Sequence, residues 1–354
     1  MRSAYSFSKA ELSEFIRPVD PARYRVDQIW AGIYKHFYQS WDQFSNIPSK
    51  LIERLSQAFQ ISPLEPIDCA RSEDGNTVKY LFKLPDGETI ESVIIKSEER
   101  NTVCISTQVG CAVGCVFCAT GAMGFKRNLL MEEIVSQVTY FAHLLAASGE
   151  KISNFVLMGM GEPFLNYDQT VAAVSLFNEA DTFDIGARRI TISTIGIPDR
   201  IKQFAEIGKQ YNLAISLHAA NDNLRNQLVP LAKRMPLASL LDAAQYYIEK
   251  TNRRITYEYV LIHQMNDSLE QAKELSLLLK DQNCHVNLIA LNKNDHFAGK
   301  APGETAIRNF SEILLANGIP TTIRNSQGAN IQAGCGQLSD RQKSIIARKN
   351  AGSN

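Results

Sequence analysis

Between residues 102 and 317 the sequence alternates short apolar runs with longer stretches of helical period. The six strand-like runs are 102–107, 152–158, 189–195, 212–218, 255–262 and 285–291. After each run, apolar residues recur every three or four positions, near 132–148, 168–179, 198–208, 236–250, 268–281 and 303–317. This alternation predicts an α/β fold of six βα units, joined by right-handed crossovers into a parallel sheet. Residues 319–326 predict one more strand.

The positions of the polar residues distinguish an incomplete barrel from an open, doubly wound sheet. A barrel gathers functional groups beyond the ends of several strands, whereas an open sheet concentrates them at one switch point. Here they follow most of the runs: a cysteine-rich loop, Gly159–Pro163, Ser193–Gly196, Ser216–His218 and Asn292. The sequence therefore favours a partial (βα)6 TIM-like barrel with its mouth at the cysteine-rich loop.

The first hundred residues have a different pattern. Residues 9–59 are helical in period, with apolar positions at Tyr24, Ile29, Trp30, Ile33, Tyr34 and Phe37. Alternating residues on both sides of Asp86-Gly87 predict a β-hairpin, with strands at 78–84 and 88–95. We expect a helical accessory domain (1–65), a hairpin extension (66–98), the barrel with a C-terminal cysteine loop (99–340) and a basic tail (341–354).

Three of the seven cysteines lie in Cys111-Ala-Val-Gly-Cys115-Val-Phe-Cys118. A structural zinc site takes four protein ligands, and an ordinary iron–sulfur cluster takes four thiolates. Three cysteines without an adjacent fourth ligand therefore leave one metal position open for chemistry. Two alternatives are a zinc loop that a distant Cys or His completes, and cysteines that serve only as small apolar residues.

Composition narrows the class of protein. The 354 residues carry 37 basic and 37 acidic side chains, so no global charge attracts nucleic acid or membrane. The sequence has neither a secretory signal nor an apolar run long enough for a membrane span. The odd number of cysteines, mostly clustered, indicates reduced thiols in metal or redox roles. We expect a cytoplasmic protein.

Two further cysteines differ in their settings. Cys104 lies inside the first strand run, where a buried thiol is ordinarily inert. Cys335 lies between two glycines in a Gly-rich segment, which favours a mobile, reactive thiol. Brought to one site, the two could act as nucleophile and resolving partner. Cys69 and Cys284 are interpreted as structural.

The spacing C-x3-C-x2-C, with an aromatic residue before the last cysteine, resembles the radical S-adenosylmethionine signature. Other elements extend the likeness, in order, over residues 20–340 to the RlmN/Cfr family of radical S-adenosylmethionine RNA (adenine) methyltransferases. They are Tyr24-Arg25, Gln28-Ile-Trp30, Ile90-Glu91-Ser-Val93, Cys104, Gln108-Val-Gly-Cys111, Cys115, Cys118, the Gly159–Pro163 loop, Ser216-Leu-His218, Asn287-Leu-Ile289 and Ala333-Gly-Cys335-Gly-Gln-Leu338. Glu162-Pro163 and Gln108-Val109 are more similar to RlmN, which methylates carbon 2, than to Cfr, which methylates carbon 8.

The resemblance implies cofactors and ligands. Cys111, Cys115 and Cys118 would hold one 4Fe–4S cluster, whose open iron binds S-adenosylmethionine and cleaves it to a 5′-deoxyadenosyl radical. Two S-adenosylmethionine molecules are used per turnover. The implied cofactor-binding residues are Gly161, Glu162, Ser193, Ser216, Leu217, His218 and Asn292. From the residues alone, the serines, His218 and Asn292 could equally be structural polar groups or turn residues.

The resemblance also implies the roles of three catalytic residues. Cys335 is first methylated, then loses a hydrogen atom to the radical, and its carbon adds to adenine. Cys104 then attacks the Cys335 sulfur, which releases the methylated base and leaves a transient disulfide. Glu91 takes up the ring proton, although its place on a hairpin strand alone predicts a solvated carboxylate.

The implied substrates are 23S ribosomal RNA, in its peptidyl transferase region, and adenine in tRNA anticodon loops. A flavodoxin or ferredoxin would supply electrons to a monomeric enzyme. The alternatives are a Cfr-type carbon 8 methyltransferase, a radical enzyme with a small-molecule or protein substrate, and a zinc-stabilised RNA-binding or ribosome-assembly module.

The RNA-binding candidates are local basic clusters, each of which alone is more typical of a solvated face. They are Lys126-Arg127, next to the cysteine loop and the favoured pair, Arg188-Arg189, Lys233-Arg234, Arg253-Arg254 and the Arg341–Lys349 tail. The sequence departs from the family pattern at two places. Asn292-Lys-Asn replaces Asn-Pro-Phe, and Ser326-Gln-Gly-Ala-Asn330 replaces an Arg-Gly-Asp-like segment.

Overall fold

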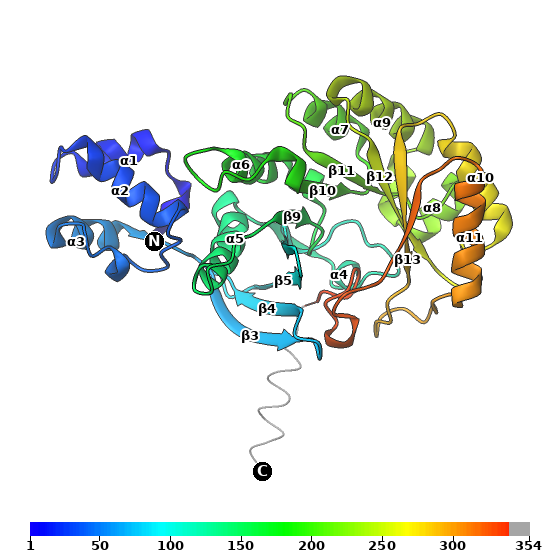
Figure 1. Ribbon diagram of the computed structural model, residues 1–354, viewed down its shortest axis with the longest axis horizontal. Coiled ribbons are helices and arrows are strands. Elements are labelled where there is room, and N and C mark those ends of the chain that lie inside the picture. Colours follow the sequence, from blue (N-terminus) through cyan, green and yellow to red (C-terminus); the bar gives the residue numbers. More distant parts are fainter. Residues whose placement is uncertain (340–354) are drawn as a thin grey trace, which may run out of the picture.

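A computed structural model describes residues 1–339 of the chain. At its centre, seven parallel strands lie side by side in chain order (Figure 1). They are β6 (Arg100–Cys104), β9 (Asn154–Leu157), β10 (Ile190–Thr194), β11 (Asn212–Ser216), β12 (Ile255–Leu261), β13 (Cys284–Ala290) and β14 (Thr321–Arg324). The sheet does not close on itself, because β14 forms one edge. The partial barrel and the additional strand predicted from the sequence are confirmed.

A helix follows each of the first six parallel strands, on the outside of the sheet (Figure 1). These helices are α5 (Met131–Ala146), α6 (Tyr167–Asn178), α7 (Pro198–Ala205), α9 (Leu237–Thr251), α10 (Leu269–Leu279) and α11 (Glu304–Ala316). Their apolar faces pack on the sheet in one continuous core. An additional short helix, α8 (Asp222–Leu228), lies between β11 and α9 and was not predicted.

Three antiparallel strands extend the sheet beyond β6. They are β5 (Thr89–Ser97), β4 (Thr77–Lys83) and β3 (Glu65–Arg71), and the hairpin at Asp86-Gly87 joins β4 to β5 as predicted. β3 was not predicted, because Pro66 was interpreted as marking the end of the preceding helical segment. Proline is tolerated there because β3 is the edge strand and has an irregular register between Pro66 and Asp68.

The N-terminal segment forms a helical unit beside α5 (Figure 1). Its helices are α1 (Lys9–Ile16), α2 (Arg23–Tyr34) and α3 (Ser49–Ala58), and β1 (Arg2–Ser3) pairs with β2 (Phe59–Gln60). Ile29, Ile33 and Leu51 are fully or almost fully buried between them. Tyr24 departs from the predicted apolar face, since it is 56% exposed.

Within residues 1–339, the helices are all too short or too polar to cross a membrane.

A hydrogen bond between buried side chains fixes this helical unit to the barrel. The Tyr5 hydroxyl donates to Thr139 Oγ1 of α5 at 2.8 Å, and burial raises the pKa of Tyr5. A second contact joins α2 to the residues after α6, where the Lys35 ammonium donates to the Ala180 carbonyl. These bonds add to the apolar core that the unit shares with the barrel, where Tyr34 and Phe37 pack against Phe183.

We expect Tyr5→Phe to lower the free energy of unfolding by about 1 kcal/mol, the net contribution of one buried hydrogen bond. Thr139 keeps its bonds to backbone carbonyls of α5, so no group is left unsatisfied. Urea unfolding followed by circular dichroism measures the change. Tyr24→Phe, at an exposed position, is the matched control. Equal loss of stability in both variants would contradict the role of the Tyr5 hydroxyl.

Candidate active site

The cysteine loop is held at its base by a small two-stranded sheet. β7 (Gln108–Gly110) pairs with β8 (Phe125–Asn128), and the Cys111 amide donates to the Gly124 carbonyl at 2.9 Å. Gly110 has a φ of +71°, and a Cβ there would lie 1.9 Å from that carbonyl oxygen. The turn into Cys111 therefore requires glycine. A short helix, α4 (Ala119–Ala122), follows Cys118.

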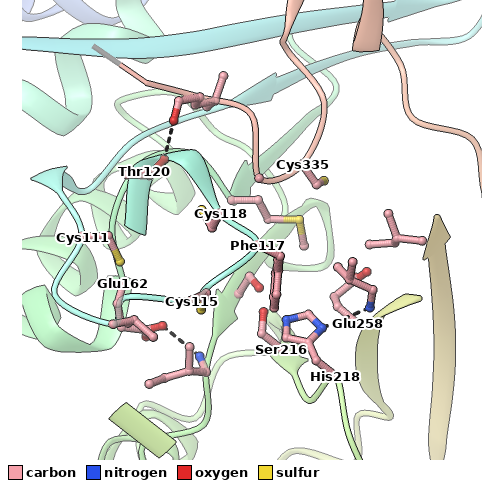
Figure 2. A pocket seen from close by; sticks show the side chains of 18 of the residues that line it. Cys111, Cys115, Phe117, Cys118, Thr120, Glu162, Ser216, His218, Glu258 and Cys335 are labelled. Atoms are coloured by element: carbon pink, nitrogen blue, oxygen red, sulfur yellow. Dashed lines mark hydrogen bonds between the residues drawn. The ribbon is translucent and has the colours of Figure 1, made fainter. Parts of the chain in front are cut away.

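The three cysteines of the loop line one cavity at the barrel mouth (Figure 2). Burial raises the pKa of Cys111 to about 12 and that of Cys115 well above its ordinary value. Thiols in such surroundings become thiolates when a cationic metal centre binds them. Within residues 1–339, no three His, Cys, Asp or Glu side chains gather closely enough for a single metal ion. Three cysteines of one loop on the wall of one cavity fit the ligand set of an iron–sulfur cluster with one open position.

Glu162 forms another wall of this cavity, directly after β9. Its carboxylate accepts hydrogen bonds from the Phe164 amide at 3.0 Å and the Ile195 amide at 2.8 Å, so both oxygens are fixed (Figure 2). Burial raises the pKa of Glu162 to about 7. Gly161, with a φ of +103°, allows the chain to pass against Gln108. A buried carboxyl group with this pKa favours a cationic ligand.

Ser193, Ser216 and His218 reach the same cavity from β10, β11 and the residues after β11. The Val260 amide donates to His218 Nδ1 at 3.1 Å, so the neutral ring carries its proton on Nε2. Burial lowers the pKa of His218 to about 3, and Phe117 packs edge-on against the ring. Leu217, between Ser216 and His218, instead points into the main core and is fully buried.

The loop that carries Cys335 lies across the mouth of the cavity (Figure 2). The Asn292 side-chain amide donates to the Cys335 carbonyl at 3.0 Å, so Asn292 contacts the loop in this structure. The Ala119 amide donates to the Gly336 carbonyl at 2.8 Å, and Thr120 Oγ1 donates to the Leu338 carbonyl at 2.7 Å. Cys335 is therefore held at the same cavity as the three cysteines of the loop.

Cys104 occupies an adjoining pocket at the end of β6. That pocket is also lined by Cys335, Val93 and Arg324, so Cys335 faces both spaces. Burial raises the pKa of Cys104 to about 12, and both cysteines are free thiols in this structure. The fold thus brings together the two cysteines that sequence analysis singled out from distant positions.

Comparison with known proteins places this geometry in a family. Residues 105–275 match the Radical SAM superfamily, and residues 5–61 match the ribosomal RNA large subunit methyltransferase N-terminal domain. A probable dual-specificity RNA methyltransferase RlmN from Dictyoglomus turgidum is 45% identical over 96% of this chain and 97% of its own length. The corresponding protein from Staphylococcus carnosus is 43% identical over 98% and 95%. The chain belongs to the RlmN family.

A solved structure supports the same conclusion. A radical SAM methyltransferase from Sphaerobacter thermophilus has a TM-score of 0.93 and 43% identity, covering 96% of this chain and 99% of that one. The predictions of family, fold and enzyme class are confirmed. As a member of this superfamily, the chain uses a 4Fe–4S cluster and S-adenosylmethionine as cofactors.

Glu91 is a buried residue in this member of the RlmN family. Its side chain is 1% exposed, one oxygen lies 2.8 Å from the Lys79 ammonium, and the other accepts from the Ser339 amide at 2.9 Å. The interpretation of Glu91 as a solvated strand carboxylate is therefore wrong. The interpretation failed because one face of a hairpin strand is ordinarily exposed to solvent, whereas the C-terminal loop covers the face that carries Glu91.

Glu258, in the middle of β12, is a site residue that was not predicted from the sequence. It is 5% exposed, lines the main cavity and accepts from the Asn287 side chain at 2.9 Å, while its second oxygen has no hydrogen-bond partner within residues 1–339. Burial raises its pKa, and Arg324, 3.7 Å away, opposes that shift. The available signal was a lone carboxylate within the apolar run 255–262.

The basic pairs differ in their position relative to the mouth. The Arg127 guanidinium forms two hydrogen bonds with Glu133, at 2.7 and 2.9 Å, and pairs with Asp86, while Lys126 pairs with Glu88. The favoured pair is thus bound to carboxylates, and Arg127 links β8 to the hairpin. Sequence reasoning could not place these carboxylates. The Arg341–Lys349 tail lies outside the described residues.

The remaining pairs divide between the two ends of the barrel. Arg188-Arg189 and Arg253-Arg254 precede β10 and β12, and so lie at the end opposite the mouth. Lys233-Arg234 ends the 3₁₀ helix that follows α8, on the mouth side. The Val116 amide of the cysteine loop donates to the Leu228 carbonyl at the end of α8, so this region adjoins the site.

We expect Gly110→Ala to lose most of its iron, because the new Cβ would collide with the Gly124 carbonyl. Anaerobically purified protein should contain about four irons per chain in the wild type, as a 4Fe–4S cluster requires. Gly124→Ala is the matched control, since it has a similar φ of +74° with open space around its Cβ. It bears roughly the same 1–2 kcal/mol of backbone strain without the collision. Equal iron loss in both variants would contradict this explanation.

We expect His218 to remain neutral between pH 8 and pH 5. Its pKa in the folded protein, about 3, lies below the ordinary value, so the unfolded chain binds the proton more readily. The contribution of His218 to stability is complete above pH 6.5 and is lost as the pH falls toward 3. NMR of the ring nitrogens measures the protonation state. A titration midpoint near 6.5 would show that the ring is solvated.

Proposed function

We propose that the protein methylates carbon 2 of an adenine in 23S ribosomal RNA, in the peptidyl transferase region, and of adenine in tRNA anticodon loops. The observation that carries the proposal is the position of Cys335, which lines both the cavity of Cys111, Cys115 and Cys118 and the pocket of Cys104. The relatives named as dual-specificity RNA methyltransferases RlmN support an RNA substrate, and the likeness of Glu162-Pro163 and Gln108-Val109 to RlmN supports carbon 2.

The residues that line the cavity support the proposed roles in binding the cluster and S-adenosylmethionine. Cys111, Cys115 and Cys118 would hold the 4Fe–4S cluster. With S-adenosylmethionine bound, the cluster would supply the electron that generates a radical able to remove a hydrogen atom from a methyl group on Cys335. The residues proposed to bind S-adenosylmethionine are Gly161, Glu162, Ser193, Ser216, Leu217, His218 and Asn292, with Leu217 limited to its backbone. The buried Glu162 carboxylate suits the cationic amino group of this ligand.

The protein's own residues perform the covalent steps. Cys335 receives a methyl group from one S-adenosylmethionine, and its carbon, after hydrogen loss, forms a bond to the adenine ring. The adduct then loses one electron, which would return to the oxidised cluster, and the ring loses one proton, which Glu91 takes. The Cys104 thiolate attacks the Cys335 sulfur, which breaks the sulfur–carbon bond and leaves a disulfide, and the released carbon takes up a proton to complete the methyl group. An external thiol reductant restores both cysteines, and a second S-adenosylmethionine is consumed in each turnover.

The electrostatics fit this order of events. Burial raises the pKa of Cys104, which favours its thiol form. Arg324 lines the pocket of both cysteines and lowers the pKa of each, so it favours the thiolate when attack is required. Cys104 thus acts as a resolving thiol rather than a constantly ionised nucleophile.

The division of the chain is proposed along the same lines. Residues 1–65 form an RNA-binding accessory domain, 66–98 the extension, and 99–340 the catalytic barrel with its cysteine loop, followed by the tail at 341–354. A flavodoxin or ferredoxin would deliver electrons to a monomer, and ribosomal and transfer RNA substrates imply a cytoplasmic enzyme. Lys233-Arg234, on the mouth side, is the described basic pair best placed to contact RNA phosphates.

We expect RNA from cells that express the gene to contain 2-methyladenine in 23S RNA and in tRNA, and RNA from deletion cells to lack it. Mass spectrometry of nucleosides separates carbon 2 from carbon 8 methylation. Carbon 8 product would replace this proposal with the Cfr-type reaction. The absence of both products would refute adenine methylation.

The cysteine variants test the mechanism. Cys335→Ala should form no protein–RNA adduct, whereas Cys104→Ala should accumulate one, because the bond to Cys335 forms but cannot be resolved. Denaturing gel electrophoresis with labelled RNA detects the adduct. Cys69→Ala, at an exposed cysteine on β3, is the control and should retain wild-type turnover. Identical behaviour of the Cys335 and Cys104 variants would refute the assigned roles.

A further inference from the structure

One face of the extension strands continues the row of residues that lines the Cys104 pocket. Cys104 on β6 is paired with Val93 on β5, and Val93 is paired with Lys79 on β4. Directly opposed residues of antiparallel strands point to the same face, so these three side chains form one row. Glu91, two residues before Val93, shares that face. The face that carries the resolving cysteine therefore also carries a lysine and a carboxylate.

Lys79 and Glu91 form a buried ion pair on this face. The Lys79 ammonium lies 2.8 Å from Glu91 Oε1, and the two side chains are 3% and 1% exposed. Such burial removes both charges from water, so each needs further polar partners. The partners come from the C-terminal loop.

The ion pair holds the loop on both sides of Cys335. The Lys79 ammonium donates to the Gln332 carbonyl at 3.0 Å, and Glu91 Oε2 accepts from the Ser339 amide at 2.9 Å. Gln332 precedes Cys335 by three residues, and Ser339 follows it by four. Both bonds are charge-assisted, which makes them stronger than bonds between neutral groups.

The backbone of the loop is shaped to fit this face. Gly328 has a φ of +66°, and a Cβ there would lie 2.6 Å from the methyl group of Thr77, two residues before Lys79 on β4. Gln332 has a φ of +54°, which is uncommon for a residue with a side chain, and its carbonyl is the one that Lys79 binds. The loop therefore meets the extension through its backbone as well as through the buried side chains of Ala333 and Leu338.

We propose that Lys79 is a positioning residue that, together with Glu91, clamps residues 328–339 and so holds Cys335 at the cavity of the three cysteines. Ala119, Thr120 and Asn292 hold the loop from the cavity side, and the Lys79–Glu91 pair holds it from the sheet side. Loss of the sheet-side hold lets the loop lift while the cluster loop stays intact. The clamp stands on geometry alone, and its catalytic consequence rests on the proposed function.

Without the clamp, radical formation at the cluster would no longer be coupled to methyl transfer from Cys335 to RNA. Lys79 does not line the cavity of Cys111, Cys115 and Cys118, so we expect cluster assembly and S-adenosylmethionine cleavage to continue without the clamp. Transfer to RNA requires Cys335 in place. A released loop would therefore yield 5′-deoxyadenosine that takes its hydrogen atom from the reductant in the assay, without an equivalent amount of methylated adenine.

Hydrogen exchange measured by mass spectrometry tests the clamp without any turnover. In Lys79→Met, amides of residues 328–339 should exchange about tenfold faster or more, because the docked loop opens more often, while the cysteine loop is unchanged. Lys83→Met is the matched control on β4, since Lys83 is half exposed and lies 3.8 Å from Glu65. Lys79→Arg, which keeps the charge, should restore slow exchange. Unchanged exchange in Lys79→Met would overturn the clamp.

Turnover assays then test the consequence. The ratio of methylated adenine to 5′-deoxyadenosine should fall about tenfold in Lys79→Met with the KM for S-adenosylmethionine unchanged, and should recover in Lys79→Arg. If Lys79→Met gives no cooperative thermal transition, Lys79→Gln replaces it in both assays. A normal ratio despite faster exchange would refute the positioning role. Wild-type protein that methylates no RNA would instead refute the proposed function and leave the exchange result standing.

Discussion

The site depends on the docking of the C-terminal loop across the barrel mouth, and this docking combines backbone hydrogen bonds with the burial of Ala333 and Leu338 in the main core. The carbonyls of Gln332, Cys335, Gly336 and Leu338 and the amide of Ser339 all bind partners elsewhere in the chain. Backbone bonds fix the path of a chain whatever side chains it carries, and each contributes about 1 kcal/mol net. The loop is thus positioned accurately by contacts that are individually weak enough to break and reform.

The cavity beneath the loop combines apolar walls with a few buried polar groups. Burial raises the pKa of Glu162 and Glu258 and lowers that of His218, so the protein surroundings alone favour the neutral forms of these side chains. A positively charged ligand reverses this preference for the carboxyl groups, because the attraction offsets the loss of hydration. S-adenosylmethionine carries two cationic groups, its sulfonium and its amino group. The same burial that makes carboxylates unfavourable without the ligand strengthens their interaction with it.

Local periodicity predicted the six βα units, because buried strands and amphipathic helices each impose a repeat on the sequence. It failed where tertiary contacts override the repeat. β3 contains Pro66, which an edge strand accepts, and Glu91 lies on a strand face that distant residues cover. The three cysteines of the loop were predictable because they are neighbours in sequence. The pocket shared by Cys104 and Cys335 was inferred only from family resemblance, since residues at opposite ends of a barrel domain share no local pattern.

The departures from the family pattern lie in the contacts that hold the loop. In Asn292-Lys-Asn, the Lys293 carbonyl accepts from the Gln337 side chain at 2.8 Å, a bond that any residue at position 293 can supply. The Asn294 side chain donates to the Phe117 carbonyl at 2.8 Å, which ties this segment to the cysteine loop. A phenylalanine at position 294 could not make that bond, so the substitution exchanges an apolar contact for a polar one. The replaced residues therefore preserve a connection between the end of β13, the cysteine loop and the Cys335 loop, and the departure is compatible with the same docked geometry.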